Sequence, residues 1–145
     1  MKESKQEIEL NHKAIDLYNI VLDIEKYPDY IPWCTKIEIL NRKKNEIKAN
    51  MIVNYKLFPQ QKFSSNVFFN LDKLLINTKY LEGPLKDLNT FWEFQNIQNN
   101  KSKIIFSVKF EFKRFIHQKI AETFYPLIEN KMIDSFKNRA NQILN

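Results

Sequence analysis

The sequence predicts an α+β protein in which a curved antiparallel sheet of about six or seven strands wraps around a long C-terminal helix. Between about residues 37 and 112, apolar and polar residues alternate with a period of two, which indicates a sheet with one buried face. From Phe115 onward, apolar residues recur at every third or fourth position, which indicates an amphipathic helix. This helix is the only long amphipathic partner in the sequence, so we expect it to cover the apolar face of the sheet.

A first strand and short helical segments precede the main sheet. Residues 5–11 alternate weakly between apolar and polar, and residues 13–24 carry apolar side chains at helical spacing. Pro28 and Pro32 then interrupt the helix, because proline lacks the N–H that a helix interior needs. The aromatic stretch 27–34 is therefore expected to form a short helical turn or a loop.

Six alternating runs predict the remaining strands. Polar turns separate the runs, so neighbouring strands are expected to pair as an antiparallel meander. The runs are residues 37–39, 47–57, 63–71, 74–81, 90–97 and 104–112. No linker, internal repeat or low-complexity segment interrupts the chain, so residues 1–145 are expected to form a single domain.

The C-terminal helix carries an apolar stripe and one proline. The stripe consists of Ile116, Ile120, Phe124, Leu127, Ile128, Met132, Phe136, Ala140, Ile143 and Leu144. Glu122 and Glu129 lie off the stripe. Because Pro126 inside a helix costs roughly 3 kcal/mol, we expect a short helix that ends near Glu122 and a main helix that starts at Thr123. A single kinked helix is the alternative.

The composition predicts a large apolar interior and excludes several kinds of site. Aromatic residues make up 14% of the chain, and 12 of its residues are Phe. A curved sheet around a helix commonly leaves a cavity, which is a ligand site by default; a solid core of Phe side chains is the alternative. A single Gly excludes a P-loop or dinucleotide fingerprint, and two His with one Cys exclude a zinc finger or a disulfide framework.

The net charge of +6 and the pI near 9.3 favour an anionic partner, either lipid headgroups or nucleic acid. Since 20 of the 23 cations are Lys, the codon bias of an AT-rich genome is an equally good explanation. The N-terminus has no signal peptide, no apolar run reaches the roughly 20 residues of a membrane span, and one Cys fits a reducing compartment. A cytoplasmic protein is therefore expected, with attachment to the inner-membrane surface as an alternative.

Two segments carry a family resemblance. Residues 17–34, LYNIVLDIEKYPDYIPWC, run from a helix into a Tyr-Pro…Pro-Trp-Cys segment, and residues 81–94, LEGPLKDLNTFWEF, join a Gly-Pro loop to an aromatic strand. Both resemble the coenzyme Q-binding protein and RatA branch of the polyketide cyclase/START-like superfamily, and residues 108–112 and 132–140 are similar to its last strand and closing helix. The resemblance covers essentially the whole chain, although Pro126 stands in a helix that this family leaves unbroken.

The resemblance implies a helix-grip fold that holds a hydrophobic ligand between the sheet and the C-terminal helix. For this branch the implied ligand is ubiquinone or a similar polyprenyl quinone, and the implied role is to support respiratory electron transport without chemistry of its own. A second role of the same branch is RatA-type binding to the large ribosomal subunit, which blocks its association with the small one. A cyclase-like enzyme is a third hypothesis and has the weakest support, because no acid–base pair or nucleophile–base arrangement stands out.

Aromatic residues and Met suit an isoprenoid chain because they offer a large, adaptable apolar area. The candidates for lining the cavity are Trp33, Tyr80, Trp92, Phe94, Phe106, Phe110, Met132 and Phe136. The loop formed by Glu82, Gly83, Pro84 and Leu85 is the candidate gate, because Gly permits unusual backbone geometry and Pro stiffens its neighbour.

Two basic groups are candidates for contact with anionic lipid or ribosomal RNA, with plain solvation as the alternative. They are Arg42, Lys43 and Lys44 in a hairpin turn, and Lys113 and Arg114 before the C-terminal helix.

Four further residues favour structural over chemical roles. Cys34 lacks a nominated base and is expected to be a partly buried structural residue. His12 is expected at the junction of first strand and helix in a capping or solvent-facing role, and His117 at the surface. Glu82 could act as a general acid at the cavity mouth, but a loop carboxylate is more often solvated.

Overall fold

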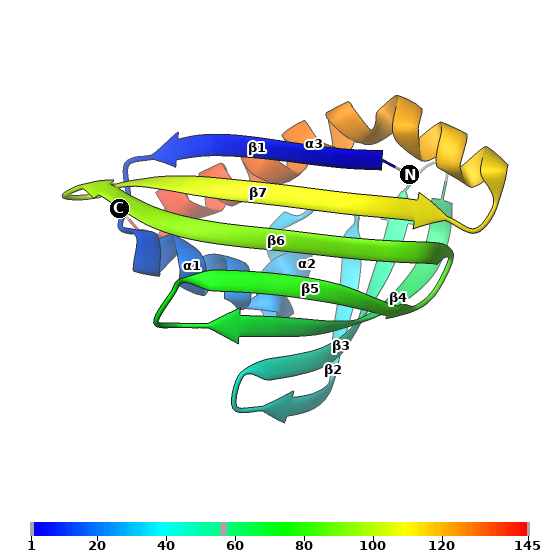
Figure 1. Cartoon of the computed structure of the whole chain (residues 1–145), viewed down its shortest axis with the longest axis horizontal. Coiled ribbons are helices and arrows are strands. Elements are labelled where there is room, and N and C mark those ends of the chain that lie inside the picture. The colour runs from blue at the N-terminus through cyan, green and yellow to red at the C-terminus, as the bar shows by residue number, and fades with distance from the viewer. Residues whose placement is uncertain (1, 56–57, 145) are drawn as a thin grey trace.

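One antiparallel sheet and three α-helices make up the part of the chain that the structure, a computed structural model, describes: residues 2–55 and 58–144 (Figure 1). Lys56 and Leu57, at the end of the predicted run 47–57, lie outside the described residues. In chain order the elements are β1 (Lys2–Leu10), α1 (Ala14–Leu22), the 3₁₀ turn η1 (Ile24–Lys26), α2 (Tyr27–Tyr30), β2 (Cys34–Lys43), β3 (Glu46–Tyr55), β4 (Phe58–Asn70), β5 (Leu75–Glu82), β6 (Leu85–Gln98), β7 (Lys101–Phe112) and α3 (Phe115–Leu144).

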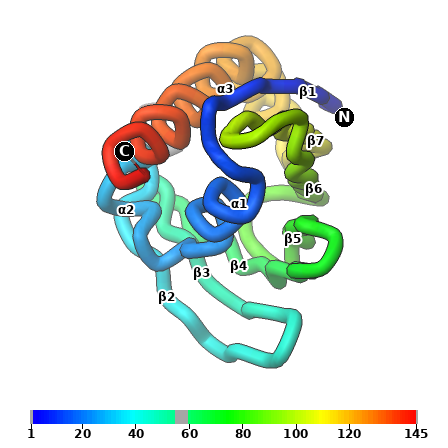
Figure 2. The backbone as a smooth tube through the Cα atoms, turned by 90° about the vertical axis from the view of Figure 1, so that its left-hand side faces the viewer, coloured from blue at the N-terminus to red at the C-terminus, as the bar shows by residue number. Residues whose placement is uncertain are grey.

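The sheet has the strand order β1-β7-β6-β5-β4-β3-β2, so the first strand pairs with the last. The predicted meander is confirmed, because every strand from β2 to β7 pairs antiparallel with the next in sequence. β1 joins at the edge, with Lys2 opposite Phe110 and Leu10 opposite Ser102. Figure 2 shows the sheet curling around the helices, with α3 along its open side. This is the predicted arrangement of a curved sheet around a long C-terminal helix.

Apolar and polar residues alternate along the strands, which gives the sheet one buried face and one solvent-exposed face. On β7, Ile104, Phe106, Val108 and Phe110 are buried, and Lys109 between the last two is exposed. Each strand therefore turns every second side chain toward the concave face. The same alternation on the neighbouring strands makes the concave face largely apolar.

The short helices lie on the concave face, where the prolines interrupt the chain. α1 buries Leu17 and Val21 against the sheet, and α2 follows one turn later. The rings of Tyr27 and Tyr30 from α2 each meet Phe136 of α3 edge-on, at centroid distances of 5.6 and 5.5 Å. The predicted short helical turn is confirmed for residues 27–30, whereas Cys34 already begins β2. The aromatic rings of the turn connect α2 to α3.

The C-terminal helix is unbroken, so the expected break between Glu122 and Thr123 is wrong. α3 includes Pro126 in its interior, and Figure 1 shows the helix as an arc rather than a straight rod. Pro126 is exposed, so the Glu122 carbonyl, which proline leaves without its helical hydrogen bond, has access to water. Buried residues on both sides of the proline, Ala121 and Phe136, hold both halves against the sheet and offset the cost of about 3 kcal/mol.

The first half of the predicted apolar stripe lies on the outside of α3, which corrects a second expectation. Ile116 is 63% exposed and Leu127 is 49% exposed, whereas Phe136 is buried. Stripe positions four residues apart advance about 40° around a helix at each step, because one residue turns it by about 100°. Over several such steps the stripe winds from the outer face to the inner face. Ile143 is 49% exposed on the last turn.

Candidate functional site

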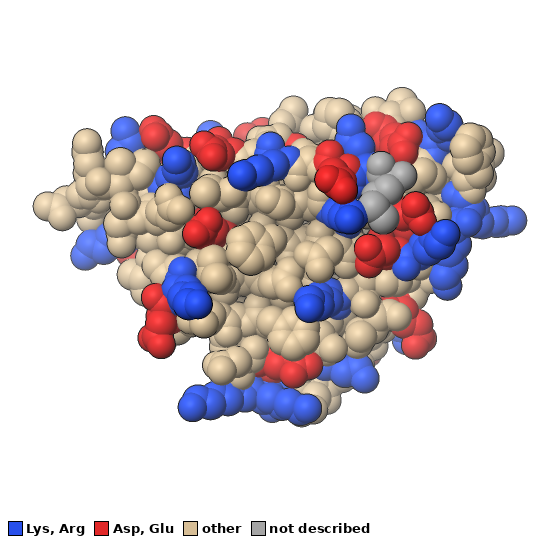
Figure 3. Space-filling view, in the orientation of Figure 1, with Lys and Arg blue, Asp and Glu red and all other residues tan. Residues whose placement is uncertain are grey.

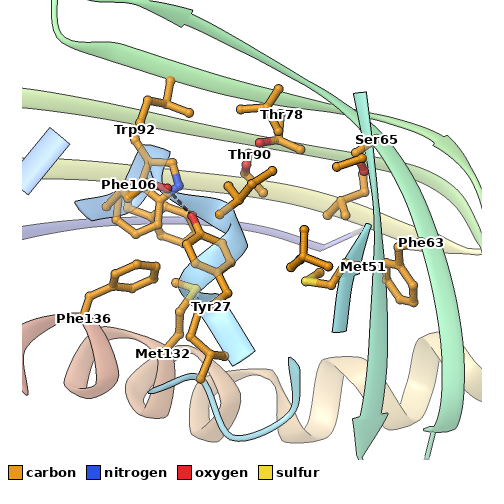
Figure 4. Close-up of a pocket in the computed structure, with 18 of the residues that line it drawn as sticks. Tyr27, Met51, Phe63, Ser65, Thr78, Thr90, Trp92, Phe106, Met132 and Phe136 are labelled. Carbon is orange, nitrogen blue, oxygen red and sulfur yellow. Dashed lines mark hydrogen bonds between the residues drawn. The ribbon is translucent and has the colours of Figure 1, made fainter. Parts of the chain in front are cut away.

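A cavity of about 180 Å³ lies between the concave face of the sheet and α3. Strands β2 to β7 form one wall, and the opposite side is formed by Met132 and Phe136 of α3 together with residues of α1, η1 and α2, among them Tyr27 (Figure 4). The two layers therefore enclose space instead of packing solid against each other. An engineered cavity of about 150 Å³ accommodates benzene, so this space is large enough for a six-membered ring.

Aromatic side chains dominate one end of the cavity. The Trp92 ring lies 4.4 Å from that of Phe106 and 5.3 Å from that of Phe136, measured between centroids. These three residues come from β6, β7 and α3, so the cluster joins the sheet to the helix. Five of the predicted lining residues line the cavity: Trp33, Trp92, Phe106, Met132 and Phe136. Ligand binding by these residues stays a prediction.

The other three candidates, Tyr80, Phe94 and Phe110, lie outside the cavity wall. Phe94 is 2% exposed and packs edge-on against Tyr18 of α1, 5.8 Å away between centroids. Phe110 is 4% exposed and packs against Tyr125 of α3 at 5.2 Å. Both side chains face inward as predicted, but a helix covers each of them and leaves no space above it. Tyr80 lies beside the Gly83 turn.

A row of hydroxyl groups crosses the sheet side of the cavity. Ser65 on β4, Thr78 on β5 and Thr90 on β6 all line it, and Thr78 lies directly opposite Thr90 in the register (Figure 4). Among the described residues of the lining, none is charged. The cavity therefore offers hydroxyl donors and acceptors in an apolar setting, which suits a neutral ligand with a few polar atoms.

The hydroxyl row was not nominated from the sequence, although a signal for it exists. In the alternating runs, Thr78 is two residues after Ile76, and Thr90 is two residues before Trp92. Residues two apart on a strand share a face, so both threonines occupy inward positions in a face that is otherwise apolar. An inward Thr among large apolar side chains is the pattern that identifies them.

Tyr27 lines the cavity from the helical side, and its hydroxyl is already engaged. The hydroxyl donates a hydrogen bond to the carbonyl oxygen of Val21 (Figure 4). The pKa of Tyr27 is raised well above its ordinary value because burial disfavours the phenolate, and nearby Tyr30, Cys34 and Asp23 raise it further. Tyr27 therefore remains protonated at neutral pH.

The candidate gate loop forms the turn between β5 and β6, and none of its four residues lines the cavity. Gly83 has φ +146°, and a Cβ there would lie 2.7 Å from the Lys62 carbonyl oxygen and 2.8 Å from the Tyr80 hydroxyl. That hydroxyl also accepts a hydrogen bond from the Leu85 N–H at 3.0 Å. The turn is thus tightly packed, and its role as a gate remains a prediction. Glu82 is exposed.

The two predicted basic groups lie at different ends of the molecule. Arg42 and Lys43 end β2, where Arg42 forms an ion pair with Glu25. Lys113 and Arg114 connect β7 to α3, and the Lys113 N–H lies 3.4 Å from the Pro84 carbonyl oxygen. The candidate gate loop and the second basic group are therefore neighbours, whereas the hairpin tip with Lys44 is remote from both (Figure 1).

Cys34 and His12 are both buried. Cys34 is 3% exposed, and burial raises the pKa of its thiol to about 11, so the unreactive thiol is the form present at neutral pH. His12 lies at the expected junction, but it is 8% exposed, so the solvent-facing alternative is wrong. Its Nε2 lies 2.8 Å from Oδ1 of Asn141, which links the junction to the end of α3. His117 is partly exposed, and its ring contacts that of Phe112.

Glu129 is a buried carboxylate that the sequence pattern placed off the buried face of α3. It is 4% exposed and accepts hydrogen bonds from Tyr125 at 2.6 Å, Ser4 at 3.2 Å and the Gln6 amide. All three donors are neutral. The network ties the edge strand β1 to α3, because polar residues of β1 turn inward opposite this part of the helix. Glu129 is outside the cavity lining.

Two further features concern metals and membranes. Within the described part of the chain, no three His, Cys, Asp or Glu side chains come together as a metal site would require. Across residues 2–55 and 58–144, none of the helices combines the length and the hydropathy of a membrane-spanning segment.

Comparison with known families identifies this architecture. Residues 10–137 match the family described as "Polyketide cyclase / dehydrase and lipid transport". The chain belongs to this family. Its fold is the helix-grip fold: a solved aromatase/cyclase of this fold, Zhui from Streptomyces sp. R1128, superposes with a TM-score of 0.90 over 99% of this chain and 96% of that one, at 12% identity. At this identity the likeness shows the fold alone.

Two curated relatives of this chain carry names that point to different functions. "Ribosome association toxin RatA" of Rickettsia prowazekii is 25% identical over 138 residues, which are 93% of this chain and 93% of the relative. "Coenzyme Q-binding protein COQ10 homolog B, mitochondrial" of Xenopus laevis is 26% identical over 131 residues, 88% of this chain and 53% of that protein. This chain is thus similar both to proteins named for ribosome association and to proteins named for coenzyme Q binding.

Proposed function

We propose that the cavity binds ubiquinone or a related polyprenyl quinone and that the protein supports quinone use in respiratory electron transport without catalysing a reaction. The observation that carries this proposal is an apolar, uncharged cavity crossed by the hydroxyl groups of Ser65, Thr78 and Thr90. The relatives named for coenzyme Q binding support it.

The chemistry of a quinone headgroup fits this wall. The ring is neutral and its carbonyl oxygens only accept hydrogen bonds, so the hydroxyl groups of Thr78 and Thr90 serve as donors. The ring carries no charge with which a charged side chain could pair. Trp92 and Phe106 offer aromatic faces to the ring. A cavity of about 180 Å³ holds the headgroup and little more. The isoprenoid tail would then extend through the mouth of the cavity.

The test removes two of the three hydroxyl groups in the row and keeps the shape of the cavity. In the double variant Thr78→Val, Thr90→Val, the affinity for decylubiquinone, followed by quenching of tryptophan fluorescence, should fall by about 5- to 150-fold, because two hydrogen bonds contribute about 0.5–1.5 kcal/mol each. Thr35→Val is the matched control, since Thr35 is exposed and donates to the Ile52 carbonyl. A wild-type protein that binds no quinone would refute the proposed ligand. Equal affinity in both variants would refute the assigned donors.

A second candidate function is RatA-type binding to the large ribosomal subunit. The relatives named for ribosome association are matched over 82% to 98% of their length, and the net charge of +6 suits a polyanion. Sedimentation with purified large subunits at low salt tests this candidate, because phosphate contacts are strongest there. Protein that stays in the supernatant under those conditions would remove it.

A further inference from the structure

The half of α3 before Pro126 and the turn after it present an apolar surface to solvent. Phe115 is 75% exposed, Ile116 63%, Phe124 38% and Leu127 49%. One residue turns a helix by about 100°, so Ile116, Leu127 and Phe124 lie within about 80° of one another, and we call these three residues the outer face of α3. Phe115, the first residue of the helix, is exposed about 100° from Ile116. On the inner face of the same segment, Ala121 and the polar Gln118 are buried. Packing against the sheet requires only the inner face, so it does not explain why the outer face of the helix is apolar.

Cations lie beside the outer face of α3, and the two acidic residues of the same segment point elsewhere. Lys113 and Arg114 precede Phe115, and the Lys119 amine lies 5.4 Å from the centre of the Phe115 ring. Between residues 113 and 131 the sequence has two acidic residues, Glu122 and Glu129. Glu129 is buried, and Glu122 accepts a hydrogen bond from Gln118, which is on the inner face. In Figure 3, Lys and Arg side chains gather at the end of the molecule where β7 runs into α3, with Asp and Glu side chains among them.

We propose that the outer face of α3 docks on the surface of an anionic lipid bilayer. Its apolar side chains enter the boundary between headgroups and acyl chains, and Lys113, Arg114 and Lys119 contact lipid phosphates. An amphipathic helix with cations beside its apolar face binds membranes in this way. The helix lies in the plane of the surface and does not cross it.

Lipid fits this surface better than nucleic acid or a second copy of the chain. A phosphate backbone would engage the cations but would leave the apolar side chains of the outer face against a polar surface. Symmetric pairing of two copies would bring Lys113, Arg114 and Lys119 close to their own counterparts, and like charges repel. A bilayer with anionic headgroups matches both the apolar residues and the cations.

The docking surface is separate from the cavity. Met132 and Phe136 line the cavity from the inner face of α3, after Pro126, whereas Phe115, Ile116 and Leu127 point outward. Membrane docking therefore goes beyond the proposed quinone binding, and either can fail without the other. Quinone affinity measured without vesicles should be the same in the docking variants as in wild type.

The test uses sedimentation with vesicles and two pairs of matched variants. Wild type should sediment with vesicles of phosphatidylcholine mixed with phosphatidylglycerol, and more weakly with pure phosphatidylcholine. Ile116→Glu with Leu127→Glu should lower the partition at least tenfold. Leu40→Glu with Leu71→Glu, which are 52% and 58% exposed at other places, adds the same charge and should have a much smaller effect.

The second pair of variants tests the cations. Lys113→Gln with Arg114→Gln should lower partition into the anionic vesicles by about 30-fold, because each cation near the surface contributes roughly fivefold. Lys43→Gln with Lys44→Gln at the β2–β3 tip makes the same change of charge and should leave partition within a few-fold of wild type. This pair leaves every apolar side chain in place, so it answers the question even if the glutamate variants fold poorly.

Three results would overturn the proposal. One is equal partition of the Ile116/Leu127 variant and its control. Another is wild-type self-association, seen in sedimentation velocity, that Ile116→Glu abolishes, since the outer face would then join two copies. The third is wild-type binding to large ribosomal subunits, without binding to vesicles, that the Lys113/Arg114 variant loses.

Discussion

Phe136 is the side chain on which the packing of α3 over the cavity depends most. It is 7% exposed, so nearly all of an aromatic side chain of about 200 Å² is buried. Its ring meets Tyr27, Tyr30 and Trp92 edge-on, with centroids 5.3 to 5.6 Å away. At about 25 cal/mol per Å², and allowing for the methyl group that alanine keeps, Phe136→Ala should lower the free energy of unfolding by about 3–5 kcal/mol.

Urea denaturation followed by circular dichroism measures this loss, and Phe115→Ala on the same helix is the control. Phe115 is 75% exposed, so its replacement should change the free energy of unfolding by less than about 1 kcal/mol. The enlarged cavity of Phe136→Ala should also bind a small aromatic compound, which would raise the midpoint of unfolding again. Equal losses in the two variants would refute the conclusion that α3 closes the cavity through Phe136.

Three further predictions concern the rest of the fold. Glu129→Gln should destabilise the protein by about 2–3 kcal/mol in urea, because the buried acceptor of three hydrogen bonds loses its charge; a loss no greater than that of Glu122→Gln would contradict this. Gly83→Ala should lower the melting temperature through a strain of about 1–3 kcal/mol, since φ is +146° and the new Cβ has no room; an unchanged melt would show that the turn can relax. Burial raises the pKa values of Tyr27, Tyr30 and Tyr125. Their contribution to stability is therefore complete below about pH 10, where unfolded tyrosine titrates, and is lost as the pH rises further. Tyr125→Phe should reduce this loss of stability in urea titrations at alkaline pH, and a pH dependence identical to that of wild type would count against the assignment.

The sheet could be predicted because a period of two is a local property of the chain. Ile104, Phe106 and Val108 alternate with polar residues, and no long-range information is needed to place them on one face. The paired antiparallel runs then fix the meander. The helix that covers the sheet follows from the lack of any other long amphipathic segment.

The cavity wall could be predicted only in part, because facing inward is not the same as facing empty space. Phe94 and Phe106 both face inward on neighbouring strands, yet Tyr18 of α1 covers Phe94 and Phe106 borders the cavity. The difference depends on where helices lie over the sheet. The hydroxyl row consists of residues that do line the cavity but are not predicted to. Thr78 and Thr90 have the alternation of inward-facing residues, but the prediction favours larger aromatic side chains.

The wrong predictions along α3 arise because spacing along the sequence does not give the direction of a side chain around the helix axis. Spacing of three or four residues looks continuous from Ile116 to Leu144, but a run of fourfold steps winds around the helix and reaches the opposite face. Glu129 was placed off the buried face for the same reason. Its burial depends on Ser4 and Gln6, more than 100 residues away in sequence, which supply the hydrogen bonds that make a buried carboxylate tolerable.

The central claim is that the cavity between the sheet and α3 holds a polyprenyl quinone. The most direct measurement is solvent extraction of protein purified from its native host, followed by mass spectrometry of the extracted lipid. The account predicts a quinone at close to one molecule per protein, and less of it in the Thr78→Val, Thr90→Val variant. An extract without quinone, from protein that is folded and was never exposed to detergent, would contradict the claim.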